Sequence, residues 1–350
     1  MSITFMDFID ALTTHPLLML ITALMLGVMV VNGWSDAPNA IATCISTRAI
    51  RVKNAVRLAV VCNLLGVFVM TSINVTVAQT IYNMVDFGKS TDDALVALCA
   101  SLVAIMVWAI MAWKIKIPTS ESHALIAGLS GAAIAFHNGL QGINGSEWQK
   151  VIFGFGASLW IGFVGGFLFV KIIERICRNC NRKKSQTFFR YGSIMGGAMM
   201  AFMHGAQSGQ KFMGVFLISI FMVNGNAHTG GIEIPIWLMC ICSIAIGLGT
   251  SIGGYKIIKA VGMDLVKLEK YQGFASDMAA SIYLFASSWL GLPVSTTHTR
   301  SSSVMGAGSA RRLSSVDWKY VKKMLLVWVL TFPCAGFLGF LFTKLFILLF

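Results

Sequence analysis

Long apolar runs recur along the chain and constrain its fold more than any other feature. The runs at 58–80, 94–113 and 150–174 each match the roughly 20 residues that a helix needs to cross a bilayer. They are continuous and lack the alternation of a membrane β-barrel. Hydrophobic residues make up 56% of the 350 residues, which is enough for about ten spans. The sequence therefore predicts an all-α polytopic membrane protein.

The low share of charged residues excludes several classes of protein. Only 12% of the residues are charged, whereas soluble domains carry about 25%. This composition excludes a soluble enzyme, a secreted disulfide-stabilised scaffold and a disordered chain. The eight cysteines are scattered, and no set of about four ligands that would hold a metal surrounds them. No cofactor is therefore expected.

The net charge of +13 is concentrated in clusters that flank the apolar runs. Residues 1–47 contain no Lys or Arg, and basic residues gather at 48–57, 175–190 and 311–323. Positive charge marks the cytoplasmic edges of membrane spans. We therefore expect a multi-pass protein of the cell membrane with both termini outside and residues 175–190 as a basic cytoplasmic connecting loop. This distribution favours the lipid bilayer, and not nucleic acid, as the partner of the basic residues.

The two halves of the chain carry the same landmarks in the same order. The charge pattern gives each half about five spans, and an odd number of spans inverts the second half relative to the first. We expect residues 1–174 and 191–350 to form two inverted-topology repeats, an arrangement typical of secondary transporters. The landmarks recur at offsets of 170 to 175 residues: 32–36 with 204–208, 117–123 with 292–298, Trp148 with Trp318, and 166–171 with 339–344.

The first long apolar run contains a break at its centre. It extends from Pro16 to Thr47, and Gly33, Asp36 and Pro38 lie in its middle. Pro38 lacks a backbone N–H and disrupts a helix, and irregular backbone at membrane depth survives only where it lines a polar cavity. A lipid-facing carboxylate would cost about 2.5–3.5 kcal/mol. We therefore expect Asp36 to face the cavity and meet a cation or a donor; the alternative is a structural ion pair inside the bundle.

A second polar pattern occurs once in each half. Pro118 is followed by Thr-Ser-Glu-Ser-His, and Pro293 by Val-Ser-Thr-Thr-His. Hydroxyls at a helix start, together with free N–H groups and the positive end of the helix dipole, form an anion site. Two such ends that converge at the midplane would suit a tetrahedral oxyanion, although Ser and Thr also serve as small packing residues in membrane helices. The two segments are either full spans or re-entrant hairpins.

Other polar residues in the apolar runs have less specific interpretations. His123, His204 and His298 are expected to cap helices or to pack, and not to bind metal. Asp277 is a further acid inside an apolar run. Arg300 could neutralise an anion or extend its side chain to the membrane surface.

These motifs resemble those of the inorganic phosphate transporter (PiT) family of sodium- or proton-coupled phosphate permeases. The resemblance rests on residues 33–40, 118–123, 205–214, 272–277 and 293–298 and covers nearly the whole chain. It implies that phosphate and a coupling cation bind between the two halves, and that the protein forms a homodimer. By position it assigns substrate binding to Asp36, Asn39, Ser120, Glu121, Ser122, Gln207, Ser208, Gln210, Lys211, Ser295, Thr296 and Thr297. By position it assigns the coupling ion to Asp36, Asn39, Glu121, Ser208 and Asp277.

Three places depart from the family pattern. Ser35 replaces an Asn, Gln207 and Ser208 replace Asn and Asp, and Glu121 replaces a Thr. One carboxylate is thus missing from the second half, and one is gained in the first. A carboxylate beside a bound oxyanion is a candidate proton carrier, so we expect Glu121 to exchange a proton during transport.

The sequence thus predicts a secondary active transporter, and not an enzyme. It would import inorganic phosphate by symport with Na⁺ and/or H⁺ and by alternating access. A permease for another tetrahedral oxyanion such as sulfate is the alternative, disfavoured because Asp36 and Glu121 would repel a dianion that cannot take up a proton. A membrane-embedded hydrolase using these acids with His123 or His298 is more remote, since no nucleophile motif or nucleotide-binding loop supports it.

Overall fold

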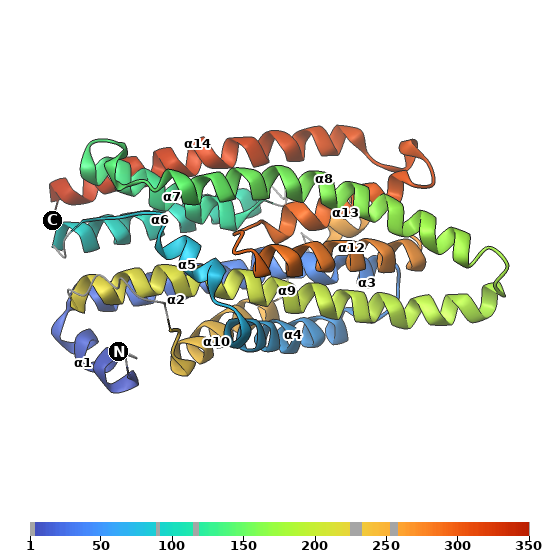
Figure 1. Ribbon diagram of the computed structural model, residues 1–350, viewed down its shortest axis with the longest axis horizontal. Helices are drawn as coiled ribbons and strands as arrows, with labels where there is room; N and C mark the ends of the chain where they lie inside the picture. The colour runs from blue at the N-terminus through green and yellow to red at the C-terminus, as the bar shows by residue number, and fades with distance from the viewer. Residues whose placement is uncertain (1–3, 89–91, 115–118, 225–232, 253–257, 350) are drawn as a thin grey trace.

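The chain folds into a bundle of long helices (Figure 1). The computed structural model describes residues 4–88, 92–114, 119–224, 233–252 and 258–349, and every regular element within them is a helix. The α-helices are α1 (Phe5–Thr14), α2 (Pro16–Ser35), α3 (Ala42–Ser46), α4 (Val52–Ile73), α5 (Thr76–Tyr82), α6 (Asp92–Lys114), α7 (Glu121–His137), α8 (Gly145–Ile176), α9 (Arg182–Asn224), α10 (Ile236–Ile252), α12 (Lys270–Trp289), α13 (Thr296–Ser309) and α14 (Trp318–Leu349). The short 3₁₀ and π turns are η1 (Ala37–Ile41), η2 (Leu140–Gly142), η3 (Ala260–Asp264) and η4 (Leu313–Ser315).

Several of these helices have the length and composition of membrane spans. Six helical stretches of the described chain are long and apolar enough to cross a bilayer. This result confirms the prediction of an all-α polytopic membrane protein. The six stretches are Pro16–Ser46, Val52–Ile73, Asp92–Lys114, Gly145–Ile176, Lys183–Val223 and Trp318–Leu349.

The molecule has two ends, which we name by the chain segments that lie there. Both termini lie at the left of Figure 1, which we call the terminal end. The turn from α8 to α9 lies at the right, which we call the connection end. The basic segment 175–190 is therefore at the connection end, opposite the termini.

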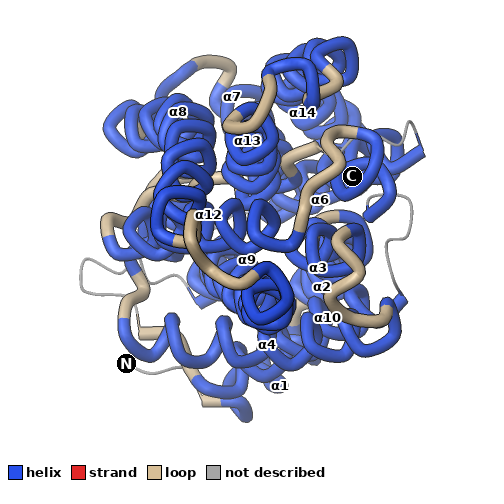
Figure 2. Tube along the Cα trace, turned by 90° about the vertical axis from the view of Figure 1, so that its right-hand side faces the viewer, coloured by secondary structure: helices blue, strands red, loops and turns tan. Residues whose placement is uncertain are grey.

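The helices form two layers, and each layer contains helices from both halves of the chain. In the end-on view of Figure 2, α7, α8, α13 and α14 lie on one side, and α2, α4 and α10 lie on the other. Within the first layer α7 packs on α14 and α13 packs on α8; within the second, α10 packs on α2 and α4. The central helix α9 packs on α4 and on α12. Residues 1–174 and 191–350 are therefore interleaved, and each layer is a mixture of the two.

Two hairpins enter the bundle from opposite ends and meet near its middle. The α6–α7 hairpin lies in the left half of Figure 1, and the α12–α13 hairpin lies in the right half. Their tips touch, because the rings of His123 in α7 and His298 in α13 are 4.7 Å apart between centroids. If each hairpin crossed the whole bundle, its tip would lie at the end opposite to the one where it enters, and the two tips would not meet. Of the two arrangements that the sequence left open, this meeting of the hairpins favours re-entrant hairpins over full spans. Pro118 lies outside the described residues.

The first long run is broken where the sequence predicts. Helix α2 ends at Ser35, residues 37–41 form the 3₁₀ turn η1, and α3 then continues to Ser46. Pro38 lies in this turn, where its missing N–H costs no α-helical hydrogen bond. The break places Asp36 at the C-cap of α2, where it is buried.

Close helix crossings within the first layer occur in matching pairs. A Cβ atom at Gly131 of α7 would overlap the carbonyl oxygen of Gly336 in α14. A Cβ atom at Gly306 of α13 would likewise overlap the carbonyl oxygen of Phe163 in α8. Small residues allow membrane helices to approach at backbone contact. The crossing of α7 with α14 therefore has a counterpart in the crossing of α13 with α8.

Alanine at either crossing glycine is expected to destabilise the fold. Gly131→Ala and Gly306→Ala force the paired helices apart, and overpacking of this kind costs roughly 1–3 kcal/mol. The midpoint of thermal unfolding in detergent should fall for both variants. Gly156→Ala in α8 is the control, because nothing lies within 4 Å of the added methyl group. Equal midpoints for all three variants would contradict this packing.

Candidate functional site

The polar patterns that follow Pro118 and Pro293, which we call the two hydroxyl motifs, lie at the starts of α7 and α13. The side chain of Ser120 caps α7 by accepting a hydrogen bond of 3.1 Å from the N–H of His123. Ser295 caps α13 in the same way, at 3.2 Å from the N–H of His298. The prediction that each motif begins a half-helix is therefore confirmed. Both serine hydroxyls hold the helix starts in place, and the residues that follow them face the interior.

Asp36 is buried and accepts hydrogen bonds from both halves of the chain. Its carboxylate accepts hydrogen bonds from the Thr297 hydroxyl and, at 3.5 Å, from the Thr296 hydroxyl. Asn39 donates to it at 3.1 Å and also to Thr297 at 2.9 Å. The family-like segment 33–40 of the first half thus contacts the hydroxyl motif of the second half. The expectation that Asp36 finds a donor is confirmed.

Lys211 makes the corresponding contact between the family-like segment 205–214 of the second half and the hydroxyl motif of the first half. Its ammonium group is buried and donates to the Ser122 hydroxyl at 2.9 Å. It also donates to the carbonyl oxygen of Val294, at 2.5 Å. A buried lysine is costly unless an anion or several acceptors surround it. Lys211 therefore supplies a positive charge between the two hairpin tips.

Glu121 adds a second carboxylate at the tip of the first hairpin. The hydroxyl of Ser35 donates to its Oε1 atom, so the two first-half departures from the family pattern contact each other. Its Oε2 atom is buried without a hydrogen-bond partner among the described residues. The same holds for Asn39 Oδ1 and for the amide of Asn32. These unpaired oxygens are acceptors that a cation or a proton could satisfy.

His204 lies between Asp36 and Ser208, which is one of the second-half departures from the family pattern. Its Nε2 atom lies 3.8 Å from Asp36 Oδ2 and 3.4 Å from the Ser208 hydroxyl. Its Nδ1 atom is 3.1 Å from the Asn63 side-chain oxygen. Sequence reasoning assigned His204 only a structural role. Its contact with Asp36 arises from the packing of α9 beside η1, which no local pattern reveals.

Gln207 and Gln210 donate hydrogen bonds to the ends of neighbouring helices. Gln207 donates to the hydroxyls of Ser288, at 2.9 Å, and Ser287, at 3.3 Å, near the end of α12. Gln210 donates to the carbonyl oxygen of Asn74 at 2.6 Å. These two of the twelve residues assigned to substrate binding by resemblance therefore have protein groups outside the two hydroxyl motifs as their hydrogen-bond acceptors.

Asp277 lies in a separate cluster toward the connection end. It forms an ion pair with Arg300 of α13, and both side chains are buried. The hydroxyl of Thr43 in α3 donates to Asp277 at 2.7 Å and accepts from Arg300 at 2.5 Å. The structure thus gives Asp277 a fixed cation as its partner, apart from Asp36 and Glu121. Thr43 was missed, although it lies one turn after Asn39.

The two hydroxyl motifs, Lys211, Asp36 and Glu121 together form a buried polar site between the two layers of helices. Lys211, the hydroxyls and the two helix starts can bind an anion. The carboxylates and amide oxygens can bind a hard cation or a proton. The described residues contain no group of three or more His, Cys, Asp or Glu side chains suited to a metal ion. A multi-pass helical bundle with such a site at the meeting point of two hairpins is typical of membrane transporters.

Comparison with known proteins agrees with this class. A model of the phosphate transporter family matches residues 32–339. The "Probable low-affinity inorganic phosphate transporter" of Bacillus subtilis (strain 168) is 37% identical over 88% of this chain and 91% of its own length. The protein of the same name from Rhizobium meliloti (strain 1021) is 34% identical over 94% of this chain and 96% of its own length.

The fold also matches a solved structure. The structure titled "The sodium-dependent phosphate transporter" superposes with a TM-score of 0.86 at 21% identity, over 96% of this chain and 100% of that one. The chain belongs to the phosphate transporter family. It is a multi-pass membrane protein that transports phosphate and not an enzyme, and the resemblance found in its motifs is confirmed.

The serine caps are expected to contribute measurably to stability. Ser295→Ala leaves the N–H of His298 without its acceptor, and loss of such a cap costs about 1 kcal/mol. The thermal midpoint in detergent should fall, whereas Ser295→Thr keeps a hydroxyl and should retain most of the stability. An equal loss for both variants would show that the position tolerates no substitution and that the cap is not the cause.

Proposed function

We propose that this protein is a secondary active transporter that imports inorganic phosphate by cation-coupled symport and alternating access. The observation that carries the proposal is the buried Lys211 ammonium between two hydroxyl-bearing helix starts, with Asp36 and Glu121 beside it. Family membership supports phosphate as the substrate. The residues around the site suggest how the anion and its coupling cation are held.

Phosphate is the oxyanion that suits this set of charges. Lys211, Ser122 and Thr297 offer donors to its oxygens, and the starts of α7 and α13 add partial positive charge. Asp36 and Glu121 would repel an anion that cannot accept a proton. Phosphate can share a proton with a carboxylate near neutral pH, whereas sulfate cannot. The site therefore favours phosphate over sulfate.

Charge balance supports coupling to cations. The buried site contains two carboxylates and one ammonium group, while Arg300 already neutralises Asp277. Addition of a phosphate anion would leave several unbalanced negative charges, which is costly away from water. Cations or protons that enter with phosphate would remove this cost. The unpaired Oε2 atom of Glu121 is a suitable place for a proton, and Asn39 Oδ1 for sodium.

The paired contacts support two inverted repeats. Asn39 donates to Thr297 at 2.9 Å, and Lys211, its counterpart in the second half, donates to Ser122 at 2.9 Å. The hairpins enter from opposite ends, and the helix crossings of the first layer are duplicated (Figure 1). Movement of one layer against the other would then expose the site to each end in turn. The basic connection end would face the cytoplasm.

The substrate assignment is tested by uptake into proteoliposomes. Radiolabelled phosphate should accumulate, with strong competition by arsenate and little by sulfate. Lys211→Met should reduce uptake by about two orders of magnitude, because a buried charged partner of the anion is worth roughly 2–5 kcal/mol. Lys150→Met, a partly exposed lysine paired with Glu147, is the control and should transport normally. Equal competition by sulfate would instead favour a general oxyanion permease.

The coupling ion is tested with separate sodium and pH gradients. If Glu121 carries a proton, Glu121→Gln should lose uptake driven by an inward proton gradient and should retain any uptake driven by sodium. Asp10→Asn, at an exposed position in α1, provides the control for a lost carboxylate. Strict sodium dependence that Glu121→Gln leaves unchanged would contradict proton transfer through this residue.

A further inference from the structure

The two hairpin helices differ sharply in the turn that follows the site. In α7 the residues 124–128 are Ala-Leu-Ile-Ala-Gly, whereas in α13 the corresponding residues 299–303 are Thr-Arg-Ser-Ser-Ser. Both stretches are buried. Since α7 extends toward the terminal end and α13 toward the connection end (Figure 1), the site is closed by different chemistry on its two sides.

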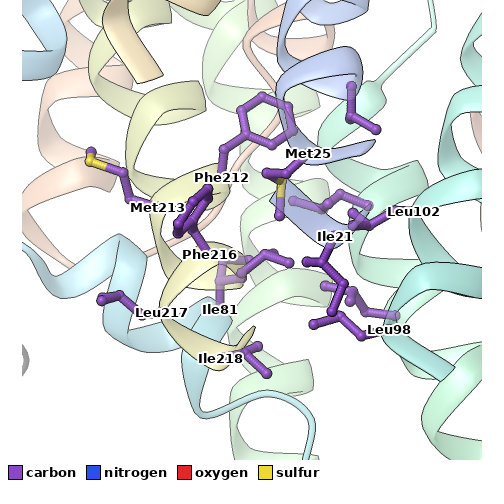
Figure 3. Close-up of a cluster of buried hydrophobic side chains, with 14 of the residues drawn as sticks. Ile21, Met25, Ile81, Leu98, Leu102, Phe212, Met213, Phe216, Leu217 and Ile218 are labelled. Atoms are coloured by element: carbon purple, nitrogen blue, oxygen red, sulfur yellow. The ribbon is translucent and has the colours of Figure 1, made fainter. Parts of the chain in front are cut away.

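On the terminal side the closure is apolar. Side chains of α2, α5, α6 and α9 pack there in one apolar cluster, as Figure 3 shows for Met25, Leu102 and Phe216. Leu125 and Ile126 of α7 belong to the same cluster. This apolar contact, which we call the apolar seam, excludes water strongly, because its opening exposes mainly apolar surface.

On the connection side the closure is polar and bears charge. Arg300 pairs with Asp277, and the Thr43 hydroxyl joins both of them to the broken helix at α3. The Nε atom of Arg300 and the hydroxyls of Ser301 and Ser302 are buried without partners among the described residues. Water that entered this seam would satisfy these groups, so hydration offsets part of the cost of opening it.

We infer that Asp277, Arg300 and Thr43 form the gate on the connection side, and that this gate opens by hydration of the ion pair while the apolar seam stays closed. Arg300 is a positioning residue, because it holds α3 against the α12–α13 hairpin and lies apart from Lys211. The inference rests on the alternating access proposed above. It adds that exposure to the connection end needs less free energy than exposure to the terminal end.

Two native cysteines report on the two seams. Cys44 follows Thr43, is fully buried and lies with its Sγ atom 2.9 Å from the carbonyl oxygen of Ser193. Cys99 of α6 is 2% exposed and belongs to the apolar cluster. With the other six cysteines replaced by alanine, the rate at which N-ethylmaleimide modifies each thiol measures the opening of its seam.

Two variants of the ion pair are expected to shift the rate of Cys44 modification in opposite directions. Asp277→Asn breaks the pair and should accelerate modification of Cys44 about tenfold, by raising the population of the open seam. The double variant Asp277→Leu with Arg300→Met makes the seam apolar, so it should slow modification of Cys44 and slow phosphate uptake. Neither variant should change the rate at Cys99. Leu125→Met, at the position of α7 that corresponds to Arg300, is the matched control and should leave both rates unchanged.

The experiment separates the gate from a purely structural ion pair. Faster modification of both cysteines in both variants would mean general loosening and would overturn the inference, as would an unchanged rate at Cys44. Thiol modification is measured without phosphate, so its result does not depend on the transported anion. Failure of wild-type phosphate uptake would instead overturn the proposed function.

Discussion

The carboxylate of Asp36 needs donors at a depth where no solvent supplies them, and much of the architecture follows from this need. A helix that continued unbroken would present the group to its neighbours without free backbone or space around it. The break at Pro38 and the 3₁₀ turn after it place Asp36 against the first turn of α13. The donors, Thr296 and Thr297, are present there only because a hairpin tip ends at the middle of the bundle. The carboxylate of Asp36, at the break after α2, thus holds the start of α13 in the interior.

The interleaving of the two halves has a consequence for motion. Each layer of Figure 2 contains helices from both halves, so a movement of one layer against the other does not separate residues 1–174 from 191–350. Within the first layer, backbone contacts at Gly131 and Gly306 fix the helices closely. Between the layers, the contacts at the site are hydrogen bonds of single side chains, which can be exchanged for bonds to a substrate. In the proposed alternating access, the boundary that moves would therefore be the one that contains the site.

The sequence predicted the local features well, because their causes are local. Pro38 breaks its own helix, and Ser120 and Ser295 cap the turns that follow them. Features that depend on spatial neighbours could not be predicted in the same way. Re-entrant hairpins and full spans share the same length and composition, as the 23 residues of α6 illustrate. The same limit applies to the partners of Asp277, since Arg300 and Thr43 are 23 and 234 residues away from it along the chain.

The geometry of the site is nearly symmetric, but its charges are not. At corresponding positions of the two halves, Asp36 is matched by Ser208, which has no carboxylate, and Asn39 is matched by Lys211. Glu121 and Leu125 correspond to Thr296 and Arg300. The first half thus supplies both carboxylates of the site, and the second half supplies the buried cations. Two identical halves would give inward-facing and outward-facing states of equal energy and equal chemistry. In the alternating access proposed above, opposite charges at corresponding positions would make the two states unequal, and bound cations would then bias one direction of exposure over the other.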